Sequence, residues 1–275
     1  MDYLTHWTGK PKQISSYSAQ YGETGAIDIN KLDTNAEIDI VSHLKSIIAS
    51  GIRFNPDINT FKSEVVPHLN STLIPVGESC NFHISTDFVL CFSNAGLTEY
   101  TLGMKYGCCG FCIDLDILKC LQINPVFYAI DEKPNLIAAT ILDTIRFLKT
   151  IKSYPHSIQF PDGKKRSIKH EAEHIEQMLM YLAGFIKPDK YENGIFKESK
   201  DKEFRIVRSV AKVDMHHQVP RAELDFITNI GDNPHLKITC DTLKKLIVPS
   251  RSIQERLYQD TLVPDWIKTI IEPIE

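Results

Sequence analysis

The sequence has no apolar run long enough to cross a membrane. A membrane-spanning helix needs about 18 to 20 consecutive apolar residues, whereas the apolar runs here are short, such as the one from Phe88 to Phe92. The first twelve residues also lack the charged-then-apolar order of a secretory signal peptide. We therefore expect a cytoplasmic protein without a membrane partner.

The sequence also lacks the compositional bias that marks fibrous or disordered proteins. Its 275 residues include only 13 glycines and 14 prolines, while 43% are hydrophobic and 24% are charged, as in globular proteins with a core. No repeat divides the chain, so we predict a single domain over residues 1–275. The net charge of −4 gives no global attraction to nucleic acid.

Cysteines are few, and their odd number argues against a disulfide framework. The seven cysteines come without a secretory signal, so we expect reduced thiols. Cys109 and Cys112 form a C-x-x-C, but it enters an expected strand, where positions three apart face opposite sides. We therefore predict buried thiols that pack in the core and bind no metal.

Familiar nucleotide-binding and hydrolase motifs are absent. No P-loop, G-x-G-x-x-G or G-x-S-x-G occurs. Residues 170–174 do match H-E-x-x-H, in which His170 and His174 bind zinc and Glu171 acts as the general base. The charged Glu173 and the preceding basic residues instead favour an exposed first helical turn. A zinc-dependent hydrolase therefore remains an alternative, not the main prediction.

The hydrophobic periodicity predicts an irregular mixture of helices and strands, hence an α+β fold. One helix begins with a capping box formed by Thr34 and Glu37 and ends at Gly51. Pro264 interrupts a helical tail over residues 253–271. Expected strands cover residues 3–8, 87–93, 111–115, 125–130, 204–210, 236–239 and 245–248, and further helices cover 137–151 and 167–185, within a helical insertion at about 135–185.

Residues 88–130 resemble the AbiGi-like family of bacterial abortive-infection proteins. The shared pattern runs from Cys91-Phe92-Ser93 through Tyr106-Gly107 and Gly110-Phe111 to Pro125-Val126-Phe127-Tyr128. The opening His6-Trp7-Thr8-Gly9, residues 185–188 and the segment Glu203-Phe204-Arg205 also fit it. The resemblance implies a phage-defence protein of a toxin–antitoxin type, in which the partner is a cognate toxin or antitoxin.

The order of these segments is also similar to that of DarT-type ADP-ribosyltransferases, which modify DNA. This second resemblance implies a split antiparallel sheet and NAD as substrate. Cleavage of the nicotinamide–ribose bond passes through an oxocarbenium-like transition state, which a carboxylate stabilises. The predicted catalytic residues are Glu203, Tyr106 and His6, and the predicted NAD-binding residues are His6, Thr8, Ser93, Tyr100 and Arg205, with Arg208 as an alternative to Arg205.

The target of such a reaction is a nucleic acid or a protein. Residues 187–212 contain eight Lys/Arg and five Asp/Glu, so this segment is basic in an acidic chain and suits phosphate contacts. Two alternatives stay open. A Glu flanked by Lys and Arg is commonly a solvated ion pair worth less than about 1 kcal/mol. The AbiGi-like family more often has a second acid and a Trp near this element, where this chain has Lys202 and Phe204, which supports a non-catalytic, antitoxin-like interaction protein as one alternative. The zinc hydrolase is the other.

Overall fold

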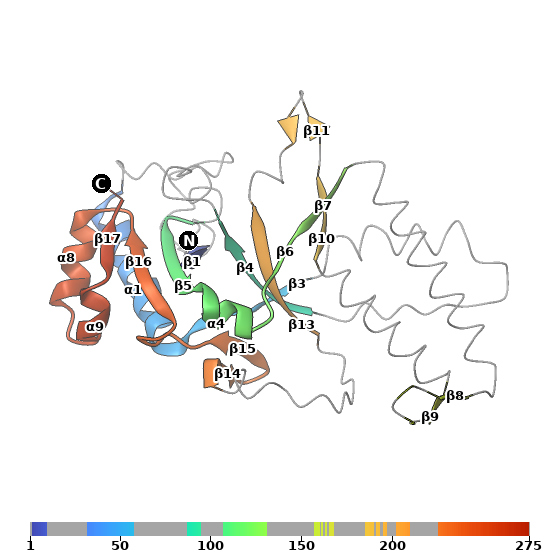
Figure 1. Ribbon diagram of the computed structural model, residues 1–275. Coiled ribbons are helices and arrows are strands. Elements are labelled where there is room, and N and C mark those ends of the chain that lie inside the picture. The colour runs from blue at the N-terminus through green and yellow to red at the C-terminus, as the bar shows by residue number, and fades with distance from the viewer. Residues whose placement is uncertain are drawn as a thin grey trace.

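The computed structural model confirms the α+β class. It describes residues 2–9, 32–57, 87–94, 107–130, 157–159, 161, 163, 165–167, 185–189, 191–192, 195–196, 202–209 and 225–274. An eight-stranded sheet, mostly antiparallel, lies at the centre, with β17 alone parallel to its neighbour β16 (Figure 1). Its strand order is β17 (Ile271–Pro273), β16 (Leu243–Val248), β5 (Cys109–Asp114), β1 (Tyr3–Thr8), β4 (Asp87–Ser93), β13 (Glu203–Ser209) and β6 (Asn124–Pro125), with β3 (Asn55–Asp57) also beside β4.

The other described strands form small sheets. Three antiparallel strands, β14 (Ile227–Ile230), β15 (Asn233–Leu236) and β2 (Ile52–Arg53), form one of them. The remaining pairs are β7 (Phe127–Ile130) with β10 (Ile186–Asp189), β8 (Ser157–Gln159) with β9 (Lys165–Ser167), and β11 (Tyr191–Glu192) with β12 (Ile195–Phe196).

The two faces of the central sheet differ in what covers them. On one face, called here the helix face, Leu4, Phe111 and Leu246 share a core with Ile40 and Leu44 of α1 (Thr34–Ser50) and with residues of α8 (Arg251–Gln259) and α9 (Asp265–Lys268). Neighbours along a strand point to opposite faces, so Tyr3, Thr5 and Trp7 of β1 point to the other one. We call this other face the polar face.

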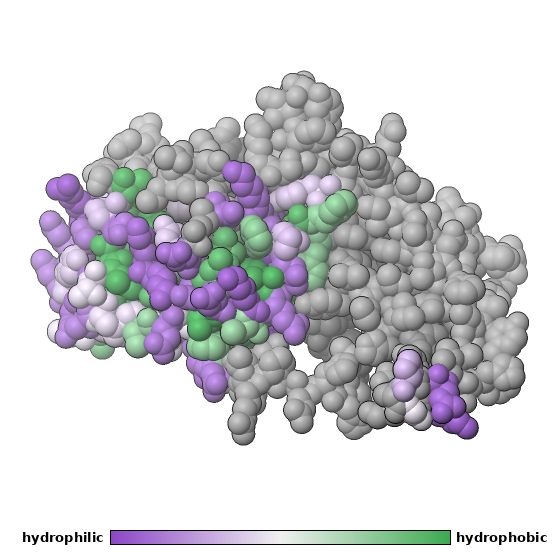
Figure 2. Space-filling view, viewed as in Figure 1, coloured by the Kyte–Doolittle hydropathy of each residue, from purple (hydrophilic) through white to green (hydrophobic). Residues whose placement is uncertain are grey.

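The surface over the helices is mainly hydrophilic. Figure 2 shows hydrophilic residues over α8 and α9, with apolar residues in small areas between them. None of the helices in the described segments is both long and apolar enough to span a membrane.

A fourth helix, α4 (Leu115–Cys120), follows β5 directly and begins at the Asp114 cap.

The start of α1 differs from the sequence prediction by one residue. Asp33, not Thr34, is the N-cap, and its side chain accepts a hydrogen bond from the Ala36 amide at 2.8 Å. Glu37 does not close a capping box but accepts hydrogen bonds from Ser252 and Arg256 of α8. The predicted end is confirmed, because the Gly51 amide donates to the Ile47 carbonyl at 2.7 Å.

We expect Asp33→Ala to lower the free energy of unfolding by about 1 kcal/mol, the usual cost of a lost N-cap. Thr34→Ala is the matched control, since Thr34 is exposed and surface substitutions of this kind change stability by less than about 0.5 kcal/mol. Denaturant unfolding of both variants measures the difference. A larger loss in Thr34→Ala than in Asp33→Ala would show that the capping box, not Asp33, begins the helix.

Several predicted boundaries are wrong for local reasons. Residues 124–130 form two strands, β6 and β7, because the chain changes its partner between them: Val126 still donates to the Glu203 carbonyl of β13, whereas Phe127 donates to the Phe185 carbonyl beside β10. The tail is not one helix, since Pro264 caps a separate α9 and Ile271 belongs to β17. The strand expected at 236–239 ends at Leu236, and residue 115 of the strand expected at 111–115 begins α4.

The helices expected at 137–151 and 167–185 lie almost entirely outside the described residues. Only the helix expected at 167–185 has described ends, and they are not helical, since Ser167 closes β9 and Phe185 precedes β10. Within the stretch 135–185, where a helical insertion is expected, the structure describes the strand pair β8–β9.

Candidate functional site

A row of polar side chains crosses five strands on the polar face. Directly opposed residues of neighbouring antiparallel strands point to the same face. Thr5 lies opposite Cys112 on β5 and Ser93 on β4, and Ser93 in turn lies opposite Glu203 on β13. At the other end, Lys245 on β16 lies opposite Cys112. The four members other than Lys245 are buried, so this polar row is part of the interior and not a solvated surface.

The Cys112 end of the polar row is chemically quiet. The Thr5 Oγ1 lies 3.5 Å from the Cys112 Sγ. Burial raises the pKa of Cys112 to about 11, although the Thr5 hydrogen bond and the charge of Lys245 act in the opposite direction. The Lys245 Nζ is engaged by Glu272 at 2.7 Å. At neutral pH Cys112 is therefore a protonated thiol, and a thiol is not the nucleophilic form.

The Glu203 end holds a buried ion pair. The Arg205 Nε donates to the Glu203 Oε1 at 2.7 Å, and the two side chains are only 7% and 10% exposed, respectively. Residues two apart on a strand share a face, so the pairing follows from the sequence Glu203-Phe204-Arg205. The burial could not be read from that sequence, and the expectation of a solvated pair is wrong.

The backbone around Glu203 is held from two sides. Its amide donates to the Tyr128 hydroxyl at 3.1 Å, and its carbonyl accepts from the Val126 amide at 2.8 Å. The preceding residue, Lys202, has a φ of +43°, in the left-handed region that non-glycine residues seldom adopt. Backbone strain of this kind concentrates at functional sites. The backbone of Glu203, at the start of β13, is thus fixed in place by Tyr128 and Val126.

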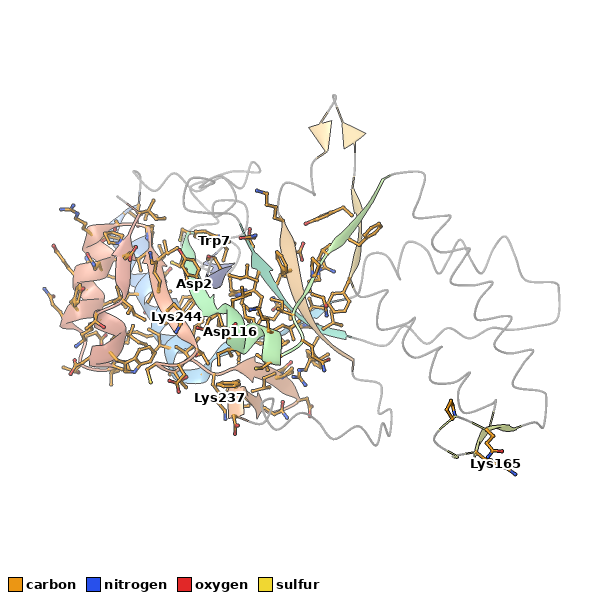
Figure 3. All side chains as sticks on the ribbon, viewed as in Figure 1. Asp2, Trp7, Asp116, Lys165, Lys237 and Lys244 are labelled. Carbon is orange, nitrogen blue, oxygen red and sulfur yellow. The ribbon has the colours of Figure 1, made fainter. Side chains whose placement is uncertain are left out.

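A second row, next to the first, contains the exposed part of the polar face. On β4 the residue two before Ser93 is Cys91, which lies opposite Arg205 and is exposed. On β1 the residue two after Thr5 is Trp7, which Figure 3 labels. It lies opposite Gly110 and is 8% exposed. Solvent therefore reaches the sheet at Cys91, opposite the buried guanidinium of Arg205.

Glycine at position 110 makes room for the indole of Trp7. A Cβ atom at Gly110 would lie 3.1 Å from the Trp7 Cζ3 and 2.8 Å from the Thr5 Cγ2. Trp7 packs with Cys112 and Ile247. The Trp7 Nε1 is buried and has no hydrogen-bond partner among the described residues, which is uncommon for a buried indole.

His6 and Thr8 lie on the helix face, opposite to Glu203. Thr5 shares the polar face with Glu203, and successive residues of a strand point to opposite faces, so His6 and Thr8 point to the helix face. The edge-on contact of His6 with Phe92, at 5.9 Å between ring centroids, agrees with this. The Thr8 Oγ1 lies 2.9 Å from the Nε2 of His43 on α1. The structure therefore does not bring the predicted pair His6 and Glu203 together.

His6 instead marks a split in the sheet. In the described segments β1 pairs with β5 at six positions but with β4 only at Thr5 and Ser93. The His6 Nδ1 lies 2.8 Å from the Cys91 carbonyl; because a carbonyl only accepts, the Nδ1 carries the proton. Burial lowers the pKa of His6 to about 4, against the effect of this hydrogen bond, and His43 lowers it further.

The low pKa of His6 predicts a loss of stability in acid. The folded value of about 4 lies below the ordinary 6.5, so between these pH values the unfolded chain binds a proton that the folded chain does not. The contribution of neutral His6 to the free energy of unfolding is complete above pH 6.5. It falls by up to about 3 kcal/mol toward pH 4, at about 1.4 kcal/mol per pH unit. An NMR titration of the imidazole measures the pKa directly; titration near 6.5 would contradict the prediction.

The buried-thiol prediction holds for only part of the cysteines. Cys108, Cys109 and Cys112 are buried, and Cys109 and Cys112 lie in cores on opposite faces of the sheet, as their spacing predicted. It is wrong for Cys91, Cys120 and Cys240, which are exposed. Strand periodicity alone could not show which positions the remaining chain covers.

Of the predicted site residues, the structure brings Glu203, Arg205 and Ser93 together on the polar face. Tyr100, Tyr106, His170 and His174 lie outside the described residues. Thr5, Trp7 and Tyr128 belong to this site and were missed. Alternation along β1 was the available signal for Thr5 and Trp7, since it separates them from His6 and Thr8; nothing local pointed to Tyr128, whose contact with Glu203 spans 75 residues.

No group of metal-ligating side chains occurs in the described segments. Comparisons with protein-family models, with curated proteins and with solved structures gave no match to this chain. The chemistry of the polar face is therefore the basis on which a function is assigned.

Proposed function

We propose that the chain is an ADP-ribosyltransferase-like phage-defence effector that uses NAD as substrate, with Glu203 as its catalytic carboxylate. The observation that carries the proposal is the position of Glu203: a buried carboxylate held by Arg205 beside Ser93, at the start of a strand and on the face that solvent reaches at Cys91. The split between β1 and β4 fits a split antiparallel sheet of the ADP-ribosyltransferase type.

The reaction needs one carboxylate at the ribose. The bond from the ribose C1′ to the nicotinamide nitrogen breaks, nicotinamide leaves with the bonding electrons, and a nucleophile of the target forms the new bond to C1′ and releases its proton. Glu203 stabilises the positive charge that develops on the ribose. In the described part of the polar row Glu203 is the only carboxylate, which favours this chemistry over two-carboxylate glycoside hydrolysis.

This assignment changes the roles of the other residues. Arg205 orients the Glu203 carboxylate, and Ser93 supplies a hydroxyl opposite it on the neighbouring strand. His6 is a positioning residue that links β1 to β4 from the helix face, through its hydrogen bond to the Cys91 carbonyl. A basic surface for a nucleic-acid target does not include Arg205, because its side chain is buried.

The test is to incubate the protein with NAD labelled in its adenylate part and with bulk RNA, DNA or cell lysate. Release of nicotinamide is measured alongside transfer of label. We expect Glu203→Gln, which keeps an oxygen for Arg205, to lower both by at least about 100-fold. Glu272→Gln is the matched control, since Glu272 pairs with Lys245 at the far end. Absence of both nicotinamide release and transfer in the wild type would overturn the proposal.

The same burial favours one alternative, a non-catalytic interaction protein with an antitoxin-like role. A buried carboxylate that is paired with an arginine inside a sheet is also consistent with a purely structural role. In that case Glu203→Gln changes stability but no turnover exists to be lost, and the chain copurifies with a cognate toxin. Nicotinamide release by the purified chain separates the two functions.

A further inference from the structure

The two hydrogen bonds that the backbone of Glu203 makes on the β6 side of β13 come from different elements. In a regular antiparallel ladder, two opposed residues of a hydrogen-bonded pair exchange both bonds. Val126 continues the β6–β13 register and supplies one of them, because its amide donates to the Glu203 carbonyl at 2.8 Å. The return bond runs from the Glu203 amide to the Tyr128 hydroxyl at 3.1 Å. A side chain of β7 therefore takes the place of a backbone carbonyl at the residue that carries the carboxylate.

The path of the chain after Val126 explains this replacement. The next amide, that of Phe127, donates to the Phe185 carbonyl, so the backbone leaves β13 and joins β10 (Figure 1). The backbone ladder ends at Val126, and the half-buried Tyr128 returns only its hydroxyl to β13. The bond to the Glu203 amide thus depends on one side-chain oxygen.

The start of β13 needs such a contact to keep its conformation. Lys202 has a φ of +43°, and a non-glycine residue stays in this region only where its surroundings hold it there. On the other side of Glu203, the Arg205 Nε holds the Glu203 Oε1 at 2.7 Å. Arg205 therefore fixes the carboxylate end of the side chain, while Tyr128 fixes the main chain from which the side chain starts.

We infer that Tyr128 is a positioning residue for the Glu203 carboxylate, whose hydroxyl determines where the carboxylate lies relative to the reacting ribose. This inference rests on the proposed function. Because the contact is to the main chain of Glu203, Tyr128 acts on the reaction through Glu203. A displacement of about 1 Å at a reacting group costs about 100-fold in rate, and the loss of one of several positioning contacts costs less.

Tyr128→Phe removes the hydroxyl and keeps the ring. We expect it to lower the kcat of nicotinamide release about tenfold and to leave the KM for NAD unchanged, because the lost contact serves the transition state. Tyr258→Phe is the matched control, since it removes the hydroxyl of an exposed tyrosine on α8. An unchanged kcat in Tyr128→Phe overturns the inference and leaves the transferase proposal standing.

A double-mutant cycle with Glu203→Gln separates positioning from a general weakening of the fold. A residue that acts through Glu203 has little effect once the carboxylate is gone. We therefore expect Tyr128→Phe to lower the residual rate of Glu203→Gln by less than about twofold. Losses of equal size in the two backgrounds would show that Tyr128 is only structural.

Hydrogen exchange at the Glu203 amide gives a readout that needs no activity. We expect the exchange to become about three- to tenfold faster in Tyr128→Phe, the range of one neutral hydrogen bond, while the amides of β5 stay unchanged. If Tyr128→Phe does not fold, the wild type decides, because a Glu203 amide that exchanges as in an unfolded chain is not held by the hydroxyl. Absence of nicotinamide release in the wild type overturns the proposed function, and the positioning role with it.

Discussion

Replacing Glu203 by alanine is expected to lower the free energy of unfolding by about 3–5 kcal/mol. The change removes the partner of a guanidinium that is only 7% exposed, and a buried charge without its counter-charge loses its solvation without compensation. Loss of activity in Glu203→Ala therefore cannot by itself identify a catalytic role. This is why the assay for transfer uses Glu203→Gln.

A double-mutant cycle measures the ion pair itself. Glu203→Leu and Arg205→Met should each be destabilising for the same reason as Glu203→Ala, whereas the double variant Glu203→Leu/Arg205→Met should recover most of the loss, since apolar replacements of a buried pair are often neutral. Denaturant unfolding of the single and double variants gives the coupling energy. Single variants that lose less than about 1 kcal/mol would show that the pair behaves like a surface salt bridge.

Gly51→Ala is expected to cost about 3 kcal/mol. Gly51 has a φ of +86°, and a Cβ there would lie 2.5 Å from the Leu236 carbonyl oxygen of β15. The left-handed backbone costs an alanine about 1–2 kcal/mol, and relief of the clash must move β15, because the obstacle is backbone and not a flexible side chain. The substitution therefore disturbs the end of α1 and the β15–β2 pairing together.

Gly231→Ala separates these two costs. Gly231 has a φ of +60°, but nothing lies within 4 Å of the position of its Cβ. Only the backbone term applies there, so we expect a loss of about 1 kcal/mol. The comparison is made by thermal and denaturant unfolding. Equal losses at the two positions would show that β15 yields to the new methyl group without cost.

Local sequence patterns correctly predicted those strands and helix ends that depend only on residues close together in the chain. The strand 3–8, the strand 87–93 and the end of α1 at Gly51 are confirmed by β1, β4 and the cap of α1. Strand alternation and the tolerance of glycine for a positive φ act over a few residues. The start of α1 was missed because Asp33 and Thr34 are both good caps, and contacts with α8 engage Glu37 instead.

Local sequence patterns predicted only part of the candidate site. Glu203, Arg205 and Ser93 were singled out from the sequence and do share a face. His6 and Thr8 were grouped with them by order along the chain, but alternation along β1 places them on the opposite face. Order of motifs says nothing about which side of a sheet a residue faces, whereas the register of β1, β4 and β13 does.

The sequence by itself determined the α+β class, the positions of the main strands and the pairing of Glu203 with Arg205, because these depend on residues close together in the chain. Only the tertiary structure decided that the ion pair is buried, that Cys91 is exposed and that Trp7 has a buried N–H without a partner. Burial and register depend on strands brought together from distant parts of the chain, and no local pattern contains that information.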